Sequence, residues 1–268
     1  MIDSPYLVAP GEKFRLKDVR TDETGPFADK VAGKAATQKN LVHLDELQER
    51  LYGESKHALL VVLQAMDTAG KDGTIEHVFS AVNPQGCSVT SFKVPTPLEL
   101  SHDYLWRYHA AVPSKGMIGI FNRSHYESVL VERVKNLVPK DVWSRRYGQI
   151  NDWERTLASE GVTIVKFFLH ISKAEQKRRL EARLADPTKQ WKFNPNDVKE
   201  RELWGDYQQA YEDALRECST KHAPWYVVPA DKKWFRNFVV SDILVRTLKE
   251  LKPQYPPAAK GLNRIVIK

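Results

Sequence analysis

Short apolar segments that alternate with stretches of helical spacing run through most of the chain. These segments predict five strands, at about residues 58–63, 88–94, 117–121, 162–171 and 223–228, and the first of them is expected to be buried. Apolar residues spaced three and four apart predict helices at about residues 41–52, 72–81, 98–109, 125–136, 144–160 and 232–251. Strands that alternate with helices indicate an α/β fold of three layers, with a mostly parallel five-stranded sheet between two layers of helices.

Two regions depart from this pattern. Residues 1–40 are rich in Pro, Gly, Asp and Lys and have weak periodicity, so we expect an irregular N-terminal arm. Residues 41–268 are then expected to form one domain. Within it, residues 172–201 predict a helix, a turn at Asp186–Pro187, and a second helix that begins near Asp197 and is capped by Asp197 and Glu200. A helical insertion after a late strand can close over a phosphate site, so we expect a lid at about 172–205.

The first strand leads into a glycine-lysine turn at residues 65–72, AMDTAGKD, and a helix follows. This order resembles a phosphate-binding loop, although Ala65 stands for its first glycine and Asp72 for its Ser or Thr. Gly70 allows backbone N–H groups to point inward, and Lys71 adds a mobile charge. The alternative is an ordinary turn with a surface lysine. The residues expected around bound phosphate are Ala69, Gly70, Lys71, Asp72, Gly73 and Thr74.

Asp67 is an acid inside a loop that is built to hold anions. Its carboxylate would repel bound phosphates unless a cation lay between them. Mg²⁺ prefers oxygen ligands and bridges carboxylates to phosphates, so we expect Mg²⁺, with Mn²⁺ as an alternative. Asp67 could instead be a turn residue bonded to nearby backbone. Asp72 lies at the predicted helix start, where an acid caps N–H groups.

Asn122 and Arg123 follow the third strand, so they should lie beside the phosphate loop at the carboxyl edge of the sheet. Asn122 can ligate a metal weakly or hold a metal-bound water. Arg123 can neutralise charge on a transferring group, or it can be a surface ion-pair partner. Glu127 and Glu132 lie on the next predicted helix. One of them can supply the acid that Asn122 lacks, and the other is then solvated.

Positive charge is concentrated in the predicted lid. The chain has 41 Lys and Arg against 34 Asp and Glu, a net charge of +7. Residues 172–201 hold nine basic and five acidic residues, so over half of the excess lies in this segment. These side chains either form a solvated basic face or line a polyanion channel. The channel residues would be Arg178, Arg179, Arg183, Lys189 and Lys192.

Other features narrow the class of protein. Cys87 and Cys218 lack the spacing of metal ligands, and the N-terminal residues lack the apolar core of a signal peptide. The longest apolar runs are too short to span a bilayer. We therefore expect a cytoplasmic protein that does not bind membranes. No ribbon of aromatic and basic residues indicates RNA binding, so nucleic acid is not an expected partner.

Four blocks of sequence together resemble the family-2 polyphosphate kinases, over about residues 40–250. The blocks are AMDTAGKDGTIEHVFSAVNPQG, SFKVPTPLELSHDYLWRYH, GIFNRSHYESVLVERV and DPTKQWKFNPND. The resemblance implies a P-loop kinase-like fold with a helical lid. It also implies Mg²⁺-dependent transfer of the terminal phosphoryl group of inorganic polyphosphate to a nucleotide, in a homodimer or homotetramer.

The resemblance also implies roles for individual residues. The catalytic residues by motif position are Asp67, Lys71, Asn122, Arg123 and Arg178. The metal ligands are Asp67, Asn122 and Glu132, and the Lys189 to Lys192 region matches the lid. Many members have Asp where this chain has Asn122. In that position the chain resembles the subgroup that accepts both nucleoside monophosphates and diphosphates, so AMP and ADP are the expected acceptors.

Two other functions remain open from the sequence. An ATP-dependent nucleotide or small-molecule kinase would share the phosphate loop and would work with ATP as its only donor. A nucleic-acid-binding protein that uses the basic lid would bind DNA or RNA in a salt-sensitive way and would turn nothing over.

Overall fold

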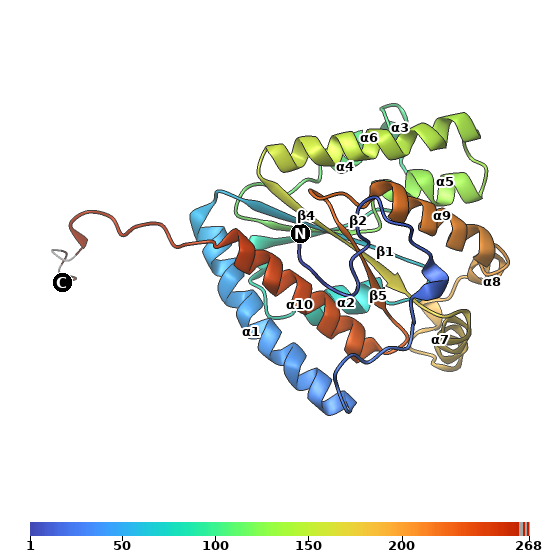
Figure 1. The fold of residues 1–268 in the computed structure, drawn as a ribbon, viewed down its shortest axis with the longest axis horizontal. Helices are drawn as coiled ribbons and strands as arrows, with labels where there is room; N and C mark the ends of the chain where they lie inside the picture. Colours follow the sequence, from blue (N-terminus) through green and yellow to red (C-terminus); the bar gives the residue numbers. More distant parts are fainter. Residues whose placement is uncertain (263–264, 266, 268) are drawn as a thin grey trace.

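Five parallel strands form one sheet in a computed structural model of the chain, which describes residues 1–262, 265 and 267 (Figure 1). The strands are β1 (Ala58–Ala65), β2 (Cys87–Ser91), β3 (Ile118–Asn122), β4 (Val162–His170) and β5 (Trp225–Pro229). Their order in the sheet is β2-β3-β1-β4-β5, and every neighbouring pair is parallel. The prediction of a parallel five-stranded sheet is therefore confirmed.

Helices cover both faces of this sheet (Figure 1). They are α1 (Lys30–Glu54), α2 (Lys71–Val78), α3 (Pro97–Leu100), α4 (Trp106–His109), α5 (Val131–Val134), α6 (Lys140–Ser159), α7 (Lys173–Ala185), α8 (Asn196–Glu200), α9 (Trp204–Cys218) and α10 (Lys233–Leu251). Helices α1, α2 and α10 pack together on one face, and α5, α6 and α9 pack on the other. None of the described helices is long and apolar enough to cross a membrane.

Strand β1 lies at the centre of the core, and all eight of its residues are buried. It pairs with β3 on one side and β4 on the other. Both of its faces are covered by helices, which explains why its sequence is a continuous apolar run. The carboxyl ends of β1, β3 and β4 meet at one edge of the sheet, so the segments that follow Ala65, Asn122 and His170 converge there.

The N-terminal arm is shorter than predicted, because α1 already begins at Lys30. Asp29 is its N-cap, and the Asp29 carboxylate accepts a hydrogen bond of 2.8 Å from the backbone N–H of Ala32. Residues 30–40 contain few large apolar side chains, which is why their spacing gave no helical signal. Gly33 lets this turn of α1 pack closely on Trp234 of α10, since a β-carbon there would lie 2.2 Å from the indole.

The remaining part of the arm covers the outer edge of β5. The backbone N–H of Val8 donates to the carbonyl of Trp225 at 2.9 Å, and Val227 donates to the carbonyl of Tyr6 at 2.8 Å. These bonds satisfy groups that an edge strand would otherwise expose.

Two predicted helices are interrupted. The helix expected at 98–109 is two four-residue helices, α3 and α4. A capping box of Thr96 and Glu99 begins α3, and the Asp103 carboxylate accepts a hydrogen bond from the N–H of Leu105 just before α4. The helix expected at 125–136 is a 3-10 helix, His125–Val129, followed by α5. Leu130 lies between them with φ −107° and ψ −85°, outside the helical region.

Residues 172–201, where the sequence predicts a lid, also differ in detail from the prediction. This segment consists of α7, the 3-10 helix Gln190–Lys192 and α8. Asn194, and not Asp197 or Glu200, accepts a hydrogen bond of 2.9 Å from the first N–H of α8, that of Asn196. Asp197 instead lies 3.7 Å from Arg183 as an ion-pair partner. The following helix α9 is missing from the sequence interpretation, although its buried residues have helical spacing: Ala210, Tyr211, Ala214, Leu215 and Cys218.

Candidate active site

The loop between β1 and α2 has the backbone of an anion-binding turn. Thr68 and Gly70 both have positive φ, 63° and 106°, and Gly70 is the N-cap of α2. A β-carbon at Gly70 would lie 1.9 Å from an Nη atom of Arg236, so only glycine fits this position. Among the described residues no side chain caps the N–H groups of the first turn of α2, so these groups are available to bind an anion.

Lys71 reaches back across this loop. Its ammonium group donates to the carbonyl of Ala65 at 3.4 Å, at the end of β1. Burial and the neighbouring Arg123 lower the pKa of Lys71, while Asp67, Glu127 and Asp72 oppose that shift. Bound phosphate would act in the same direction as these acids, so it would favour the charged ammonium group.

Arg123 joins the phosphate loop to the segment after β3. Its guanidinium lies 3.6 Å from the carboxylate of Asp67 and 3.9 Å from that of Glu127. Burial opposes its charge, but Glu127 and Asp67 raise the pKa of Arg123. Its backbone, with φ 64°, is fixed by a hydrogen bond from its N–H to the carbonyl of Leu63. The structure thus brings together Asp67, Lys71 and Arg123, as the sequence predicted.

Asn122 contacts Asp72 rather than Asp67. Its side-chain amide donates to the Asp72 carboxylate at 2.7 Å. Asp72 lies in the first turn of α2, but no side chain of the described residues caps that helix, so the capping role expected for Asp72 is not observed. Because the amide nitrogen makes this bond, the side-chain carbonyl oxygen of Asn122 remains available as a metal ligand. Thr74, another expected phosphate neighbour, donates its hydroxyl to the carbonyl of Gly70 at 3.0 Å.

The two glutamates after β3 have different surroundings. Glu132, the expected metal ligand, forms an ion pair of 2.6 Å with Arg146. Glu127 pairs with Arg123 and contributes to the charge around Lys71. The structure therefore places Glu127, and not Glu132, beside the loop residues.

A buried ionic network supports the segment that carries Arg123. The Lys166 ammonium donates to Glu154 at 2.6 Å and to the Tyr126 hydroxyl at 2.7 Å, and His125 bonds Glu154 at 3.0 Å. Lys166, Glu154, His125 and Tyr126 are all fully buried. Burial opposes ionisation of Glu154, but Lys166 and His125 hold its pKa below the usual value. His125 is thus an interior residue.

The basic residues of α7 divide into two groups. Arg178 is exposed and forms two hydrogen bonds of 2.6 Å with Glu175. Arg179 is buried, and its five N–H donors bond Glu175 and four backbone carbonyls, those of Thr68, Ala69, Ala230 and Asp231. All the donors of Arg179 are thus engaged inside the protein rather than offered to a phosphate. The expectation that Arg179 lines a polyanion channel is therefore corrected.

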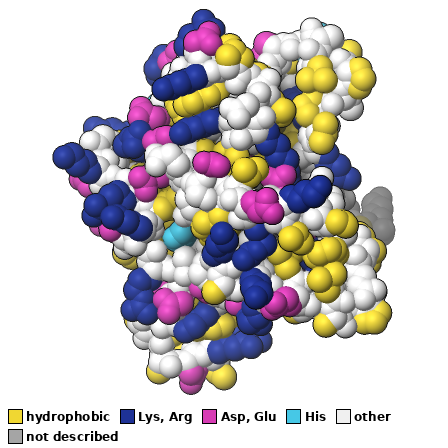
Figure 2. Space-filling view, turned by 90° about the vertical axis from the view of Figure 1, so that its right-hand side faces the viewer, with side chains coloured by type: hydrophobic (Ala, Val, Ile, Leu, Met, Phe, Trp, Pro, Cys, Tyr) yellow, Lys and Arg dark blue, Asp and Glu magenta, His cyan; other side chains and the backbone are white. Residues whose placement is uncertain are grey.

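The other expected channel residues lie further along the chain, between the end of α7 and α8. Arg183 donates to the carbonyl of Lys192 at 3.2 Å and pairs with Asp197. Lys189 is exposed and pairs with Asp186, and Lys192 is exposed beside the ring of Trp191. Figure 2 shows this end of the molecule, where Lys and Arg side chains cover much of the surface with acidic side chains between them.

Two buried residues at the loop were not predicted. Arg236 of α10 is 2% exposed and donates to the carbonyl of Ala69 at 3.1 Å. Burial and the nearby Arg179 lower the pKa of Arg236 to about 9, so it stays charged at neutral pH. Gln176 of α7 donates to the carbonyl of Asp67 at 2.9 Å. The sequence could have indicated Arg236, because a charged residue on the apolar face of a predicted helix is unusual. It contains no comparable indication for Gln176.

Oxygen atoms that could bind Mg²⁺ lie near this edge on the carboxylates of Asp67, Asp72 and Glu127 and on the side-chain carbonyl of Asn122. Within the described residues these carboxylates do not form a group of three or more that could hold a metal ion by themselves. Mg²⁺ is usually held by one or two carboxylates together with waters and substrate phosphates, so a single carboxylate here fits an ion whose shell the substrates complete.

Comparison with known proteins shows the family of this chain. Residues 28–256 match the family model described as Polyphosphate kinase 2. The chain is 56% identical over 266 residues to the AMP/ADP-polyphosphate phosphotransferase of Meiothermus ruber, covering 98% of both chains. It is 44% identical to the ADP-polyphosphate phosphotransferase of Rhodopseudomonas palustris, covering 94% of this chain and 91% of that one.

A solved structure has the same fold. The crystal structure of Polyphosphate Kinase 2 from Arthrobacter aurescens superimposes with a TM-score of 0.93 at 45% identity, covering 97% of this chain and 93% of that one. The predicted P-loop kinase-like fold is therefore confirmed. Because the family model matches most of the chain and the full-length relatives are well above 30% identical, this protein belongs to the polyphosphate kinase 2 family.

Proposed function

We propose that this protein transfers the terminal phosphoryl group of inorganic polyphosphate to ADP and to AMP. The observation that carries the proposal is the position of Arg123, between Asp67 and Glu127 and beside Lys71. Cations and carboxylates alternate there at the carboxyl edge of a parallel sheet, where two anionic substrates need both cationic groups and metal ligands. The names of the relatives from Meiothermus ruber and Rhodopseudomonas palustris support the same donor and acceptors.

The chemistry requires little covalent work from the protein. A terminal phosphate oxygen of the nucleotide attacks the last phosphorus of the polymer, and the bond from that phosphorus to the next bridging oxygen breaks. The shortened polymer leaves as an anion, and the attacking oxygen is already ionised at neutral pH, so no general base is needed. Lys71 and Arg123 offset the negative charge on the transferring group.

Mg²⁺, or Mn²⁺ in its place, is part of this proposal. The carboxylate of Asp67 and the side-chain carbonyl oxygen of Asn122 would hold the ion, and Glu127 lies next to them. The phosphates of both substrates would complete the coordination shell. When bound, the ion would offset phosphate charge and bring donor and acceptor together. Asp67 also keeps Arg123 in position in its absence, through the 3.6 Å contact.

The lid supplies the remaining cations. Arg178 and Lys192 are exposed, and Lys189 and Arg183 are held only by contacts within the lid, among the residues that the structure describes. These side chains can therefore turn toward a polyanion without breaking the core. We infer that they hold the polyphosphate chain and help exclude water from the site.

A location in the cytoplasm and assembly as a homodimer or homotetramer complete the proposal. Both rest on the sequence features and the family resemblance. Light scattering of the purified protein would give the mass of the assembly directly.

An assay with separate donors and acceptors tests the proposed function. Purified protein with Mg²⁺ is given polyphosphate as its only phosphoryl donor and either ADP or AMP as acceptor. We expect ATP from ADP and ADP from AMP. A protein that phosphorylates these acceptors only when ATP is added would be an ATP-dependent kinase, and the proposal would be wrong.

A further inference from the structure

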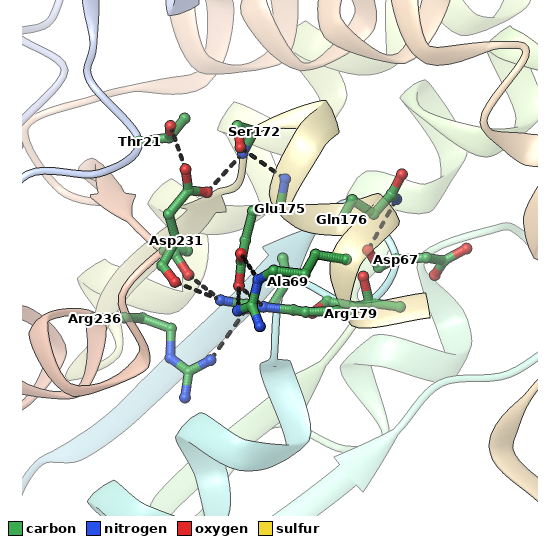
Figure 3. Close-up of polar contacts among 12 residues, drawn as sticks. Thr21, Asp67, Ala69, Ser172, Glu175, Gln176, Arg179, Asp231 and Arg236 are labelled. Atoms are coloured by element: carbon green, nitrogen blue, oxygen red, sulfur yellow. Dashed lines mark hydrogen bonds and ion pairs between the residues drawn. The ribbon is translucent and has the colours of Figure 1, made fainter. Parts of the chain in front are cut away.

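Side chains of α7 donate hydrogen bonds to three successive backbone carbonyl groups of the phosphate loop (Figure 3). Gln176 donates to the carbonyl of Asp67, and Arg179 donates to those of Thr68 and Ala69 at 3.0 Å and 2.9 Å. These hydrogen bonds fix the orientation of the three peptide planes. The loop is thereby set in one conformation before any anion binds.

Gln176 uses both ends of its amide. Its Nε2 group donates to Asp67, and its Oε1 atom accepts a hydrogen bond of 2.6 Å from Arg201. A carbonyl can only accept and a guanidinium can only donate, so these two partners fix the orientation of the amide. The side chain is 3% exposed, which protects both bonds from competition with water.

Arg201 connects this amide to the lid. It is the C-cap of α8, and the same guanidinium nitrogen also donates to the carbonyl of Lys173 in the first turn of α7 at 3.1 Å. A continuous path therefore runs from α8 through Arg201 and Gln176 to the backbone of Asp67. Movement of α8 away from α7 would remove one of the two bonds that hold Gln176.

We propose that Gln176 is a positioning residue that couples the position of the lid to the backbone of Asp67. When α8 packs against α7, Arg201 holds the Gln176 amide, and the amide holds the loop residue that carries the proposed metal ligand. Gln176 touches no substrate in this scheme. The inference rests on the proposed function and adds the means by which lid and loop act together.

Variants that keep the size of the side chain test this coupling. Gln176→Met and Arg201→Met each remove one partner of the 2.6 Å bond, and the double variant removes both. Lys177→Met is the matched control, because Lys177 is the next residue of α7, is exposed, and pairs with Glu181 on the same helix. The measurements are kcat, KM for ADP at saturating polyphosphate, and the melting temperature.

We expect Gln176→Met to lower kcat by about tenfold or more while KM for ADP changes by less than about threefold, because a displaced loop affects the transferring group more than the nucleotide. Arg201→Met should lower kcat in the same way. The double variant should fall by no more than about twofold below the more severe single variant, since the two residues act through one path. Lys177→Met should behave as wild type.

Gln176→Glu separates the two bonds. An ionised carboxylate still accepts from Arg201 but cannot donate to the carbonyl of Asp67, so we expect kcat to stay low. Wild-type kcat in Gln176→Met or Gln176→Glu would overturn the proposal, even if stability fell. Effects of Gln176→Met and Arg201→Met that multiply in the double variant would overturn the coupling to the lid.

A failure of the proposed function can be told apart from a failure of this inference. If the wild-type protein makes no ATP from polyphosphate, hydrogen exchange at residues 66–71 still tests the path. Both Gln176→Met and Arg201→Met should then speed exchange in the loop relative to Lys177→Met. Unchanged exchange in the two variants would overturn the inference on its own.

Discussion

The side-chain amide nitrogen of Asn122 lies 2.7 Å from a carboxylate oxygen of Asp72, which joins the end of β3 to the first turn of α2. Asn122→Asp would place two carboxylates at this distance, where both can stay ionised only with a cation nearby. We expect the melting temperature of this variant to be lower than that of wild type when a chelator is present. Addition of Mg²⁺ should raise the melting temperature of the variant more than that of wild type. Thermal unfolding with and without Mg²⁺ measures both effects.

The exchanged pair is the control for this prediction. Asn122→Asp combined with Asp72→Asn keeps one donor and one acceptor at the same contact, so its stability in a chelator should return toward that of wild type. Equal melting temperatures for wild type and Asn122→Asp in the chelator would contradict the repulsion.

Two neighbouring arginines of α7 should differ sharply in their effect on stability. Arg179→Gln removes a buried group that satisfies four carbonyls and Glu175, so we expect the free energy of unfolding to fall by roughly 3–5 kcal/mol. Arg178→Gln removes an exposed side chain that pairs with Glu175, and should leave stability unchanged. Urea unfolding of the two variants checks this, and similar losses in both would argue against the assignment.

Replacement of glycine by alanine should have opposite effects on stability at Gly70 and at Gly148. Gly70→Ala forces a β-carbon against Arg236 in a backbone of φ 106°, so we expect lost stability and lost activity together. Gly148 lies within α6, where an added β-carbon would meet no atom of the described residues within 4 Å. Gly148→Ala should therefore stabilise the protein by up to about 1 kcal/mol. Calorimetry separates them, and an active, stable Gly70→Ala protein would contradict the loop geometry.

Buried His170 should make the protein less stable in acid. Burial lowers the pKa of His170 from 6.5 to about 4. Between these values the unfolded chain binds a proton that the folded chain does not, so the free energy of unfolding falls as pH falls from 6.5 and levels off below about 4. The full loss is about 3 kcal/mol. Wild type should therefore lose stability relative to His170→Gln over this range.

The pH series needs a histidine outside the core as its control. His43 of α1 is exposed, so His43→Gln should follow the wild-type pH dependence. If His170→Gln also follows the wild-type pH dependence, the buried histidine does not cause the loss of stability in acid. Urea unfolding at several pH values gives the comparison.

Much of the fold and the centre of the site could be predicted from the sequence. Strands β1, β3, β4 and β5 are apolar because both of their faces are covered, whereas no residue of the edge strand β2 is fully buried. Gly70–Lys71 and Asn122–Arg123 follow strands that end at one edge. The start of α1 could not be found from apolar spacing, since Gly33 and its neighbours pack through small side chains. Its signal was the N-cap Asp29.

The sequence did not decide between adjacent residues of the same type. Arg178 and Arg179 have equal charge, and only the rotation of α7 against the loop decides which guanidinium is buried. Glu127 and Glu132 likewise both follow β3, and the position of Arg146 decides that Glu132 pairs away from the loop. These choices depend on contacts between distant segments, which local patterns do not contain.

The central claim is that Lys71, in the phosphate loop, acts on a phosphoryl group donated by polyphosphate. The most direct test is ATP formation from ADP with polyphosphate as sole donor, in the wild-type protein, in Lys71→Ala, and in Lys249→Ala as a control on the last turn of α10. We predict ATP from the wild-type and Lys249→Ala proteins and none from Lys71→Ala. ATP formation by Lys71→Ala at the wild-type rate would contradict the account.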